Sequence, residues 1–269
     1  MSKLSKSFRA LLKIARNPWL LNRVLEDDLE WKRFITRKFK MEQGFPVIQA
    51  VDLFGDFSES VSPFAYLDGG SLPTDLALLK KLARRIPGCN YFEIGTWRGE
   101  SVANVATVAE KCTTLNLSGE EMYAMGLNPK YIKMHGFFSK NLPNVRHLEG
   151  NTRSFDFSSL EEKFDLIFID GDHHYEMVRN DTRKVFSHLA HDKTIVVWHD
   201  YAKNPENIRF EVMAGILEGV PDKDRSKIFH VANTLCAVYM PEDHIGSPMD
   251  APVVPSGFFE IKIDFHKTS

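Results

Sequence analysis

The 269-residue sequence predicts an α/β protein built on a mostly parallel sheet with helices on both faces. Segments 164–170 and 194–198 are almost wholly apolar, as expected for strands in the middle of a sheet that helices cover on both sides. Strand-like and helix-like segments alternate for about 170 residues, which is typical of repeated β-α-β units. The segments expected to form seven strands are 90–95, 113–117, 145–148, 164–170, 194–198, 228–231 and 235–240.

Helices are expected between these strands, because apolar residues recur there at helical spacing. Pro73 suits the first turn of a helix, where no intrahelical bond needs its missing amide hydrogen, and this helix should end before Pro87 and Gly88. The other helices are expected at 101–110, 129–140, 175–190 and 206–219.

The segments on either side of this core have a different character. Residues 7–40 show the spacing of one or two amphipathic helices, the second beginning near Pro18, and residues 41–72 are expected to form an irregular connecting or lid segment. Residues 257–265 alternate apolar and polar side chains, which predicts an edge strand. The expected parts are thus an N-terminal helical extension with the lid (1–70), the α/β domain (71–242) and a C-terminal extension with the edge strand (243–269).

The distribution of charge limits the choice of partners. The formal net charge is −2, whereas a general nucleic-acid binder usually carries a basic excess, so we expect no nucleic-acid partner. Residues 1–40 contain 11 Lys and Arg against 4 Asp and Glu, a charge of +7. Such a segment suits a peripheral contact with an anionic membrane surface, or packing between the subunits of a homo-oligomer.

Three cysteines, Cys89, Cys112 and Cys236, occur without a CxxC or Cys/His metal pattern. An odd number of cysteines suits free, buried thiols in a reducing compartment. We also recognise no signal peptide and no apolar run near the ~20 residues that cross a bilayer, so a cytoplasmic protein is expected.

A glycine-rich turn after the first strand is the expected ligand site, because ligands of parallel sheets bind beyond the carboxyl ends of the strands. Glu93 lies at the end of the strand, Gly95 permits the sharp turn, and Gly99 lets the main chain approach a ligand. The GxGxxG dinucleotide fingerprint is absent, since Trp97 occupies the place of its second glycine, and no Walker A Gly-Lys-Ser/Thr is present.

The turn resembles the S-adenosylmethionine (SAM) motif of class I methyltransferases, an acidic residue followed by Gly-x-x-x-Gly-x-Ser. The residues that fit this motif are Glu93, Gly95, Gly99 and Ser101. Residues 165–176 (DLIFIDGDHHYE) and 194–200 (TIVVWHD) resemble Methyltransf_24-type small-molecule O-methyltransferases, and the similarity covers roughly residues 70–240. The resemblance implies a Rossmann-like, seven-stranded class I methyltransferase fold.

The resemblance also implies contacts with SAM, the glycine turn holding its methionine moiety. The position for the ribose is usually acidic but aligns here with Asn116, and Glu120 is the alternative. Asn151 and Thr152 would lie near the adenine, or they only cap their loop. The residues expected around the cofactor are Glu93, Gly95, Thr96, Gly99, Ser101, Asn116, Asn151, Thr152 and Asp170.

Asp170 and Asp200 follow neighbouring strands, so their carboxylates are expected at one edge of the sheet, where hard oxygen ligands suit Mg²⁺. Similar enzymes bind Mg²⁺ at these positions, with a further ligand that is an acidic residue just before the second aspartate or Asn just after it. Here those neighbours are His199 and Tyr201. The third ligand is therefore His199, which suits a softer metal, or Asp172. Alternatively, the two aspartates only cap helices and bind loop amides.

A hydroxyl acceptor must lose its proton, which requires a general base or a metal. His173 lies three residues after Asp170, where related sugar methyltransferases have a catalytic histidine. An imidazole of ordinary pKa can accept a proton near neutral pH. We therefore expect His173 and Asp170 to act in catalysis, and His174 to cap a helix or face solvent.

These features predict a SAM-dependent methyltransferase acting on a hydroxyl of a sugar, glycan or other small natural product, with Mg²⁺ as an optional assistant. Two alternatives stay open: a metal-independent N-methyltransferase, and a non-catalytic SAM-binding scaffold that acts through its N-terminal helices. The intact Gly95/Gly99 and Asp170/Asp200 pairs argue against a degenerate scaffold, whereas Asn116 argues mildly for it.

Overall fold

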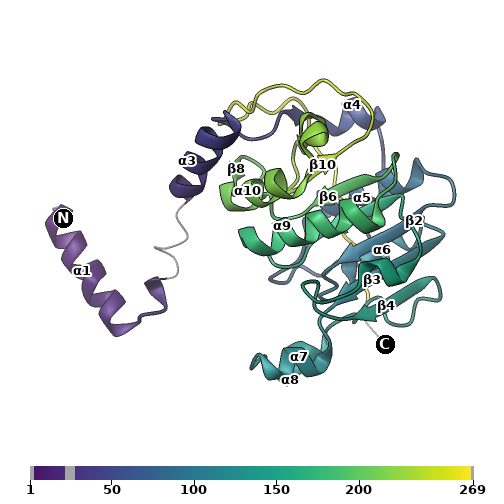
Figure 1. Cartoon of the computed structure of the whole chain (residues 1–269), viewed down its shortest axis with the longest axis horizontal. Helices are drawn as coiled ribbons and strands as arrows, with labels where there is room; N and C mark the ends of the chain where they lie inside the picture. The colour runs from purple at the N-terminus through teal and green to yellow at the C-terminus, as the bar shows by residue number, and fades with distance from the viewer. Residues whose placement is uncertain (1–2, 22–27, 268–269) are drawn as a thin grey trace.

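The computed structural model describes residues 3–21 and 28–267. It confirms the predicted architecture, because a mostly parallel sheet lies between two helical layers (Figure 1). Within the described residues the sheet has eight strands, the seven predicted ones and a short strand from the segment expected to be irregular. Their spatial order is β1 (Val47–Ile48), β9 (Ile228–Val231), β10 (Ala237–Tyr239), β6 (Ile195–Trp198), β5 (Leu166–Ile169), β2 (Asn90–Ile94), β3 (Lys111–Asn116) and β4 (Val145–Glu149).

The strand order reverses between β2 and β5. From β2 the chain runs outward to β3 and β4, and it then returns to β5 and β6 on the other side of β2. These five strands pair in parallel, whereas β10 pairs antiparallel with both β6 and β9. The carboxyl ends of β2 and β5 therefore flank the reversal point, where ligands of such sheets bind.

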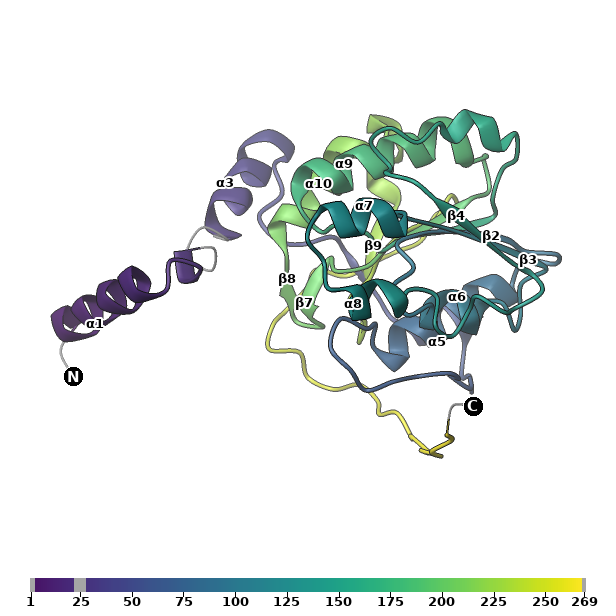
Figure 2. The ribbon, with the colours of Figure 1, turned by 90° about the horizontal axis from the view of Figure 1, so that it is seen from below.

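Each face of the sheet packs against its own helical layer (Figure 2). The four residues of β5 are all buried, and alternate residues face opposite layers, as the pleat of a strand requires: Leu166 and Phe168 face one layer, Ile167 and Ile169 the other. One layer contains α5 (Pro73–Arg84) and α6 (Glu100–Val105), and the other contains α9 (Tyr175–Lys184), its π-helical continuation Val185–Leu189, and α10 (Phe210–Gly219).

Several short elements differ from the prediction. The helix expected at 206–219 begins at Phe210, because Glu206 lies in the turn between two short strands. An unpredicted helix begins at a capping box in which Ser118 and Glu121 exchange hydrogen bonds. The short elements are α4 (Ala50–Phe54), α7 (Gly119–Ala124), α8 (Pro129–Lys133), β7 (Ala202–Asn204) and β8 (Asn207–Ile208).

The two N-terminal helices differ in their contacts. Helix α3 (Asp28–Phe39) packs on α10 and α9, with Ile35 buried and the Trp31 ring 4.7 Å from the Tyr175 ring. Helix α1 (Lys3–Arg16) projects away from the sheet in both views (Figures 1 and 2), and none of its residues is buried. The helix expected near Pro18 falls partly on residues 22–27, outside the described ranges. Among the described helices, none is long and apolar enough to span a membrane.

The predicted edge strand at 257–265 is wrong. Residues 257–267 form neither helix nor strand, and Phe258 and Phe265 are about nine-tenths exposed. Alternation shows only that a segment is able to form a strand, which also needs an open edge to pair with. The outer edge of β1 is partly taken by a bridge between Val47 and Ser247, so the C-terminal segment does not pair there.

Candidate active site

The turn after β2 lies directly against the end of β5. Gly95 has a φ of +92°, and a Cβ there would lie 2.0 Å from the Asp170 carbonyl oxygen. Gly99 has a φ of +79°, and its Cβ would lie 2.2 Å from Ser139 Oγ. Both glycines are thus required by contacts within the protein. For Gly99 this corrects the expectation that the space left by the missing side chain serves a ligand.

The loop after α8 covers one side of this turn. Gly136 donates its backbone N–H to the Trp97 carbonyl (2.7 Å), and Phe138 donates to the Arg98 carbonyl (2.9 Å). The Trp97 ring packs on the Tyr131 ring, with centroids 4.2 Å apart. The second half of the turn is therefore engaged by the protein itself, and Thr96 in its first half is buried as well.

Glu93 is fully buried beside the turn. Its carboxyl group accepts hydrogen bonds from the Tyr91 hydroxyl (2.7 Å) and the Thr114 hydroxyl (3.3 Å), and Ser101 also contributes one. Burial raises the pKa of Glu93 to about 8, although the bonds from Ser101 and Tyr91 oppose this rise. These contacts give Glu93 a role in holding the turn, and its contact with SAM stays a prediction.

Asn116, the predicted ribose residue, lies next to the turn at the end of β3. Its Oδ1 accepts the backbone N–H of Thr96 at 3.3 Å, and its Nδ2 donates to the Leu117 carbonyl at 3.1 Å. The alternative, Glu120, is exposed in the first turn of α7. Asn116 is therefore the better placed of the two.

Asn151 and Thr152, the predicted adenine residues, make the capping contacts of the alternative interpretation. Asn151 accepts the backbone N–H of Arg153 through Oδ1 (3.0 Å) and that of Phe155 through its carbonyl (2.7 Å). Thr152 is buried and donates to Asp181, whose pKa burial nonetheless raises to about 6. An adenine contact for either residue stays a prediction.

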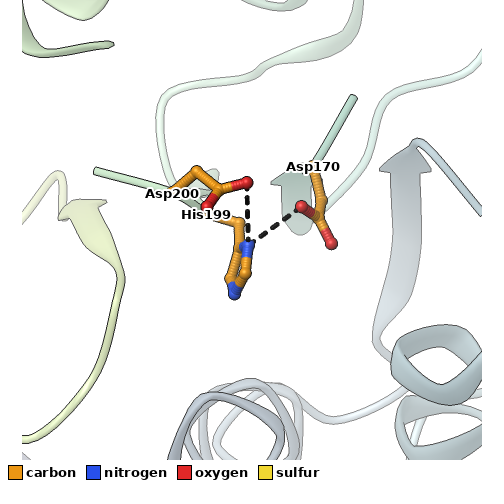
Figure 3. A group of neighbouring side chains, drawn as sticks. All are labelled: Asp170, His199 and Asp200. Carbon is orange, nitrogen blue, oxygen red and sulfur yellow. Dashed lines mark ion pairs between the residues drawn. The ribbon is translucent and has the colours of Figure 1, made fainter. Parts of the chain in front are cut away.

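Asp170, His199 and Asp200 converge at the ends of β5 and β6 (Figure 3). His199 Nδ1 lies 3.0 Å from Asp170 Oδ1 and 3.5 Å from Asp200 Oδ2, and the candidate ligand atoms all lie within 4.8 Å of one another. Neighbouring ligands that are each ~2.1 Å from an octahedral ion are ~3.0 Å apart. The spacing of these three side chains therefore fits a common metal ion.

The charges around His199 also favour a cation. Burial lowers the pKa of His199, but Asp170, Asp200 and Asp75 outweigh burial and raise that pKa well above its ordinary value. Burial raises the pKa of Asp170. Burial would also raise the pKa of Asp200, but His199 and Arg209 hold it at about 2. The carboxylates that stabilise a protonated imidazole would equally attract a divalent cation.

A small pocket adjoins this cluster and has the size of a single ion. Its volume is about 10 Å³, roughly one water-sized sphere, and its lining includes Asp170, His173, His199 and Asp200. His199 is 8% exposed, and its Nδ1 lies close to both carboxylates without the alignment of a hydrogen bond. A buried nitrogen that faces two carboxylates beside a small pocket fits a metal ligand.

The exposed histidines His173 and His174 precede α9 with stacked rings, centroids 5.0 Å apart. His174 Nδ1 lies 2.5 Å from Asp172 Oδ1, at the N-cap position of α9. Asp172 is thus paired with His174, whereas His199 lies between Asp170 and Asp200. His199 is therefore the better placed of the two candidates for a third metal ligand. His173 lines the small pocket, as a base acting there must.

Sequence reasoning missed two residues that contact this cluster directly. Asp75, buried in the first turn of α5, has its Oδ2 3.2 Å from His199 Nε2, 124 residues away along the chain. Arg209 lies 3.4 Å from Asp200. No local pattern marks either contact, because Asp75 meets His199 only in the folded chain and the hairpin that brings Arg209 back to Asp200 is not evident in the sequence.

Three further residues connect the lid segment to the helix after the glycine turn. Glu100 accepts the backbone N–H of Ala65 (2.6 Å), and Asn104 accepts that of Ser62 (2.8 Å). The buried guanidinium of Arg98 donates to the carbonyl of Asp68 at 3.0 Å. Residues 62–68 are thereby held beside the turn.

The region that contains the turn and the cluster matches a known family. Residues 92–201 match the Methyltransf_24 model, which is described as a methyltransferase domain. This match identifies residues 92–201 as a methyltransferase domain. The methyltransferase domain includes Asp170, His199 and Asp200, whereas Asp75 and Arg209 lie outside the matched range.

Solved structures similar to this chain include an O-methyltransferase from Bacillus cereus in complex with S-adenosylhomocysteine (SAH), at 17% identity over 65% of this chain and 84% of that chain, with a TM-score of 0.45. An O-methyltransferase of tomaymycin synthesis from Streptomyces achromogenes, in complex with SAM, is 15% identical over 64% and 82%, with a TM-score of 0.43. A putative caffeoyl-CoA O-methyltransferase from Staphylococcus aureus is 17% identical over 88% and 100%, with a TM-score of 0.44. No curated protein sequence matches the chain.

Proposed function

We propose that the protein transfers the methyl group of SAM to a hydroxyl of a sugar, glycan or other small natural product. The observation that carries this proposal is the position of Asp170. Its backbone touches the glycine turn at Gly95, and its side chain belongs to the cluster with His199 and Asp200. A methyl donor on the turn and an acceptor at the cluster would be neighbours, as an in-line displacement requires.

The residues of the cluster suit the deprotonation of a hydroxyl. Carboxylate oxygens of Asp170 and Asp200, together with His199 Nδ1, would hold a divalent ion, which when bound lowers the pKa of a hydroxyl beside it. His173, at the rim of the pocket, would accept the hydroxyl proton on a ring nitrogen. The one-ion volume of the pocket implies that the body of the acceptor lies outside it.

For SAM itself, we propose that Gly95 and Thr96 contact the methionine moiety and Asn116 one ribose hydroxyl. Asn151 and Thr152 would border the adenine. Asn116 offers an amide in place of the usual carboxylate, and its Oδ1 already accepts the Thr96 N–H. Its Nδ2 donates one hydrogen to the Leu117 carbonyl, and its second hydrogen would donate to a ribose oxygen.

The test combines binding with turnover. Titration calorimetry of the full chain with SAH should show binding, and radiolabelled methyl transfer should be detected on hydroxylated sugars or phenols, with loss in EDTA and recovery on adding a divalent metal. Failure to bind SAH would contradict the proposal. Transfer to amines that persists in EDTA would favour the N-methyltransferase alternative, and SAH binding without any turnover would favour the scaffold.

We also propose that α1 contacts an anionic membrane surface. At helical spacing, one side of α1 carries apolar side chains and the opposite side basic ones, and residues 3–21 include no Asp or Glu. Leu4, Phe8 and Leu11 are each at least 66% exposed. A basic amphipathic helix gains from burying its apolar face at the lipid boundary and from attraction to anionic headgroups.

Vesicle sedimentation tests this proposal. The full chain should bind vesicles that contain phosphatidylserine, bind pure phosphatidylcholine weakly, and lose binding in high salt, since each basic residue near the surface contributes ~1 kcal/mol. The triple variant Leu4→Ser/Phe8→Ser/Leu11→Ser should not bind, whereas Ile245→Ser, a change at a 97% exposed position, should bind normally. Equal binding to both lipids would contradict the proposal. Absence of vesicle binding, together with a wild-type dimer that becomes a monomer in the triple variant, would contradict it as well.

A further inference from the structure

We infer that Asp75 makes His199 a metal ligand through Nδ1, and that the site therefore selects a transition-metal ion such as Mn²⁺, Fe²⁺, Co²⁺ or Zn²⁺ over Mg²⁺. The inference rests on the proposed metal-assisted function. It is carried by the contacts of Asp75 and by the kind of ligand atoms that these contacts assemble.

Asp75 is held as a hydrogen-bond acceptor. Its side chain is fully buried, Oδ2 accepts the backbone N–H of Leu72 (2.6 Å), and Oδ1 accepts that of Leu235 (2.8 Å). Two backbone donors from different parts of the chain fix the orientation of the carboxylate. The same Oδ2 lies 3.2 Å from His199 Nε2, so the proton of a neutral His199 belongs on Nε2.

A neutral imidazole with its proton on Nε2 has its lone pair on Nδ1. This is the atom that faces Asp170 and Asp200 at 3.0 and 3.5 Å, and it is buried without an aligned hydrogen bond. Most metal-binding histidines donate their other N–H to a carboxylate or carbonyl, which fixes the tautomer and the ring orientation. Asp75 supplies that contact from α5, outside the matched methyltransferase domain.

The resulting ligand set contains two carboxylates and one imidazole. Mg²⁺ prefers oxygen ligands and water, whereas imidazole suits transition metals, and a set of one histidine and two carboxylates lies between the all-oxygen sites and the histidine-rich ones. The imidazole ligand therefore disfavours Mg²⁺ relative to these transition metals.

Metal binding measured on the chelator-treated full chain, without SAM, tests the inference. Free Mn²⁺ measured by electron paramagnetic resonance should fall as one ion binds per chain, and Mg²⁺ should compete at least ~10-fold more weakly. Co²⁺ should give the visible absorption of a nitrogen- and oxygen-ligated ion, and His199→Gln should change that spectrum.

Two variants separate the role of Asp75 from simple structural support. Asp75→Asn presents an amide that can donate to Nε2 and so favours the wrong tautomer, which should lower Mn²⁺ affinity ~10–100-fold. Since this variant also alters the acceptor at the start of α5, His199→Glu is the second test, and it should shift preference toward Mg²⁺ while keeping a ligand in place. The control His230→Gln alters a buried histidine bonded to the Thr234 carbonyl and should leave Mn²⁺ affinity unchanged.

Several outcomes would overturn the inference: no binding of any divalent ion, Mg²⁺ binding as tight as that of Mn²⁺, or unchanged Mn²⁺ affinity in a folded Asp75→Asn variant. SAH affinity and methyl transfer in EDTA are measured separately. Normal transfer in EDTA would reject the metal while leaving a SAM-dependent methyltransferase, and absent SAH binding would reject the proposed function itself.

Discussion

Replacing Asp200 with alanine is expected to abolish methyl transfer while leaving SAH affinity within a few-fold of the wild-type value. The substitution removes one ligand of the proposed metal site and leaves Arg209 without its carboxylate partner, 3.4 Å away. Metal activation of a hydroxyl contributes several kcal/mol to the lowering of the barrier. Turnover should therefore fall by ~100-fold or more, since each ~1.4 kcal/mol corresponds to a factor of ten.

Turnover is measured with the best acceptor from the hydroxyl panel, and SAH affinity by calorimetry on the same preparation. Asp243→Ala, a change to an exposed aspartate outside the site, is the matched control and should behave as wild type. Full activity of the Asp200→Ala variant would show that the metal assignment is wrong. A large loss of SAH affinity would place Asp200 in cofactor binding instead.

Gly95→Ala is the second change with a large expected effect, on both stability and SAH binding. The new Cβ would lie 2.0 Å from the Asp170 carbonyl oxygen, and both atoms belong to the ends of central strands that cannot move apart easily. Steric crowding of this kind costs ~1–3 kcal/mol, and the positive φ adds ~1–2 kcal/mol. We expect the free energy of unfolding to fall by ~3 kcal/mol and SAH binding to be lost.

Gly126→Ala is the control that separates these two costs. Gly126 also has a positive φ, +81°, but its Cβ would meet no atom within 4 Å. Only the ~1–2 kcal/mol backbone cost should appear, with normal SAH binding. Urea denaturation and SAH calorimetry measure the stability and the SAH affinity of both variants. Equal losses in the two variants would show that the contact between Gly95 and Asp170 is not the cause.

Most strands of the sheet were predictable because short-range patterns of apolar residues mark the segments that form them. A parallel strand covered on both faces must be apolar on both, so short uninterrupted apolar runs such as 164–170 and 194–198 indicate central strands. The sharp turn needs glycine for local backbone reasons, which made Gly95 visible. The carboxyl ends of parallel strands meet at one edge, and this rule alone brought Asp170 and Asp200 together.

The failures have an equally physical origin. The alternation of 257–265 described a capacity to pair, but pairing depends on which sheet edges other segments leave open. The pattern of 7–40 also did not distinguish α3, which packs on α9 and α10, from α1, which does not bury any residue. An amphipathic pattern predicts that a helix has an apolar face, but it does not predict what packs against that face.

From its order of residues alone, this chain revealed its layered α/β scaffold, its glycine turn and the paired aspartates, because periodicity and backbone stereochemistry act over a few neighbouring residues. Folding in three dimensions added the partners of those groups: Asp75 on His199, Arg209 on Asp200, and Ser139 against Gly99. Two of these contacts join segments that are 40 or more residues apart along the chain, and the third, between Arg209 and Asp200, spans nine residues. They depend on how the helices and loops pack around the sheet, which no local sequence pattern predicts.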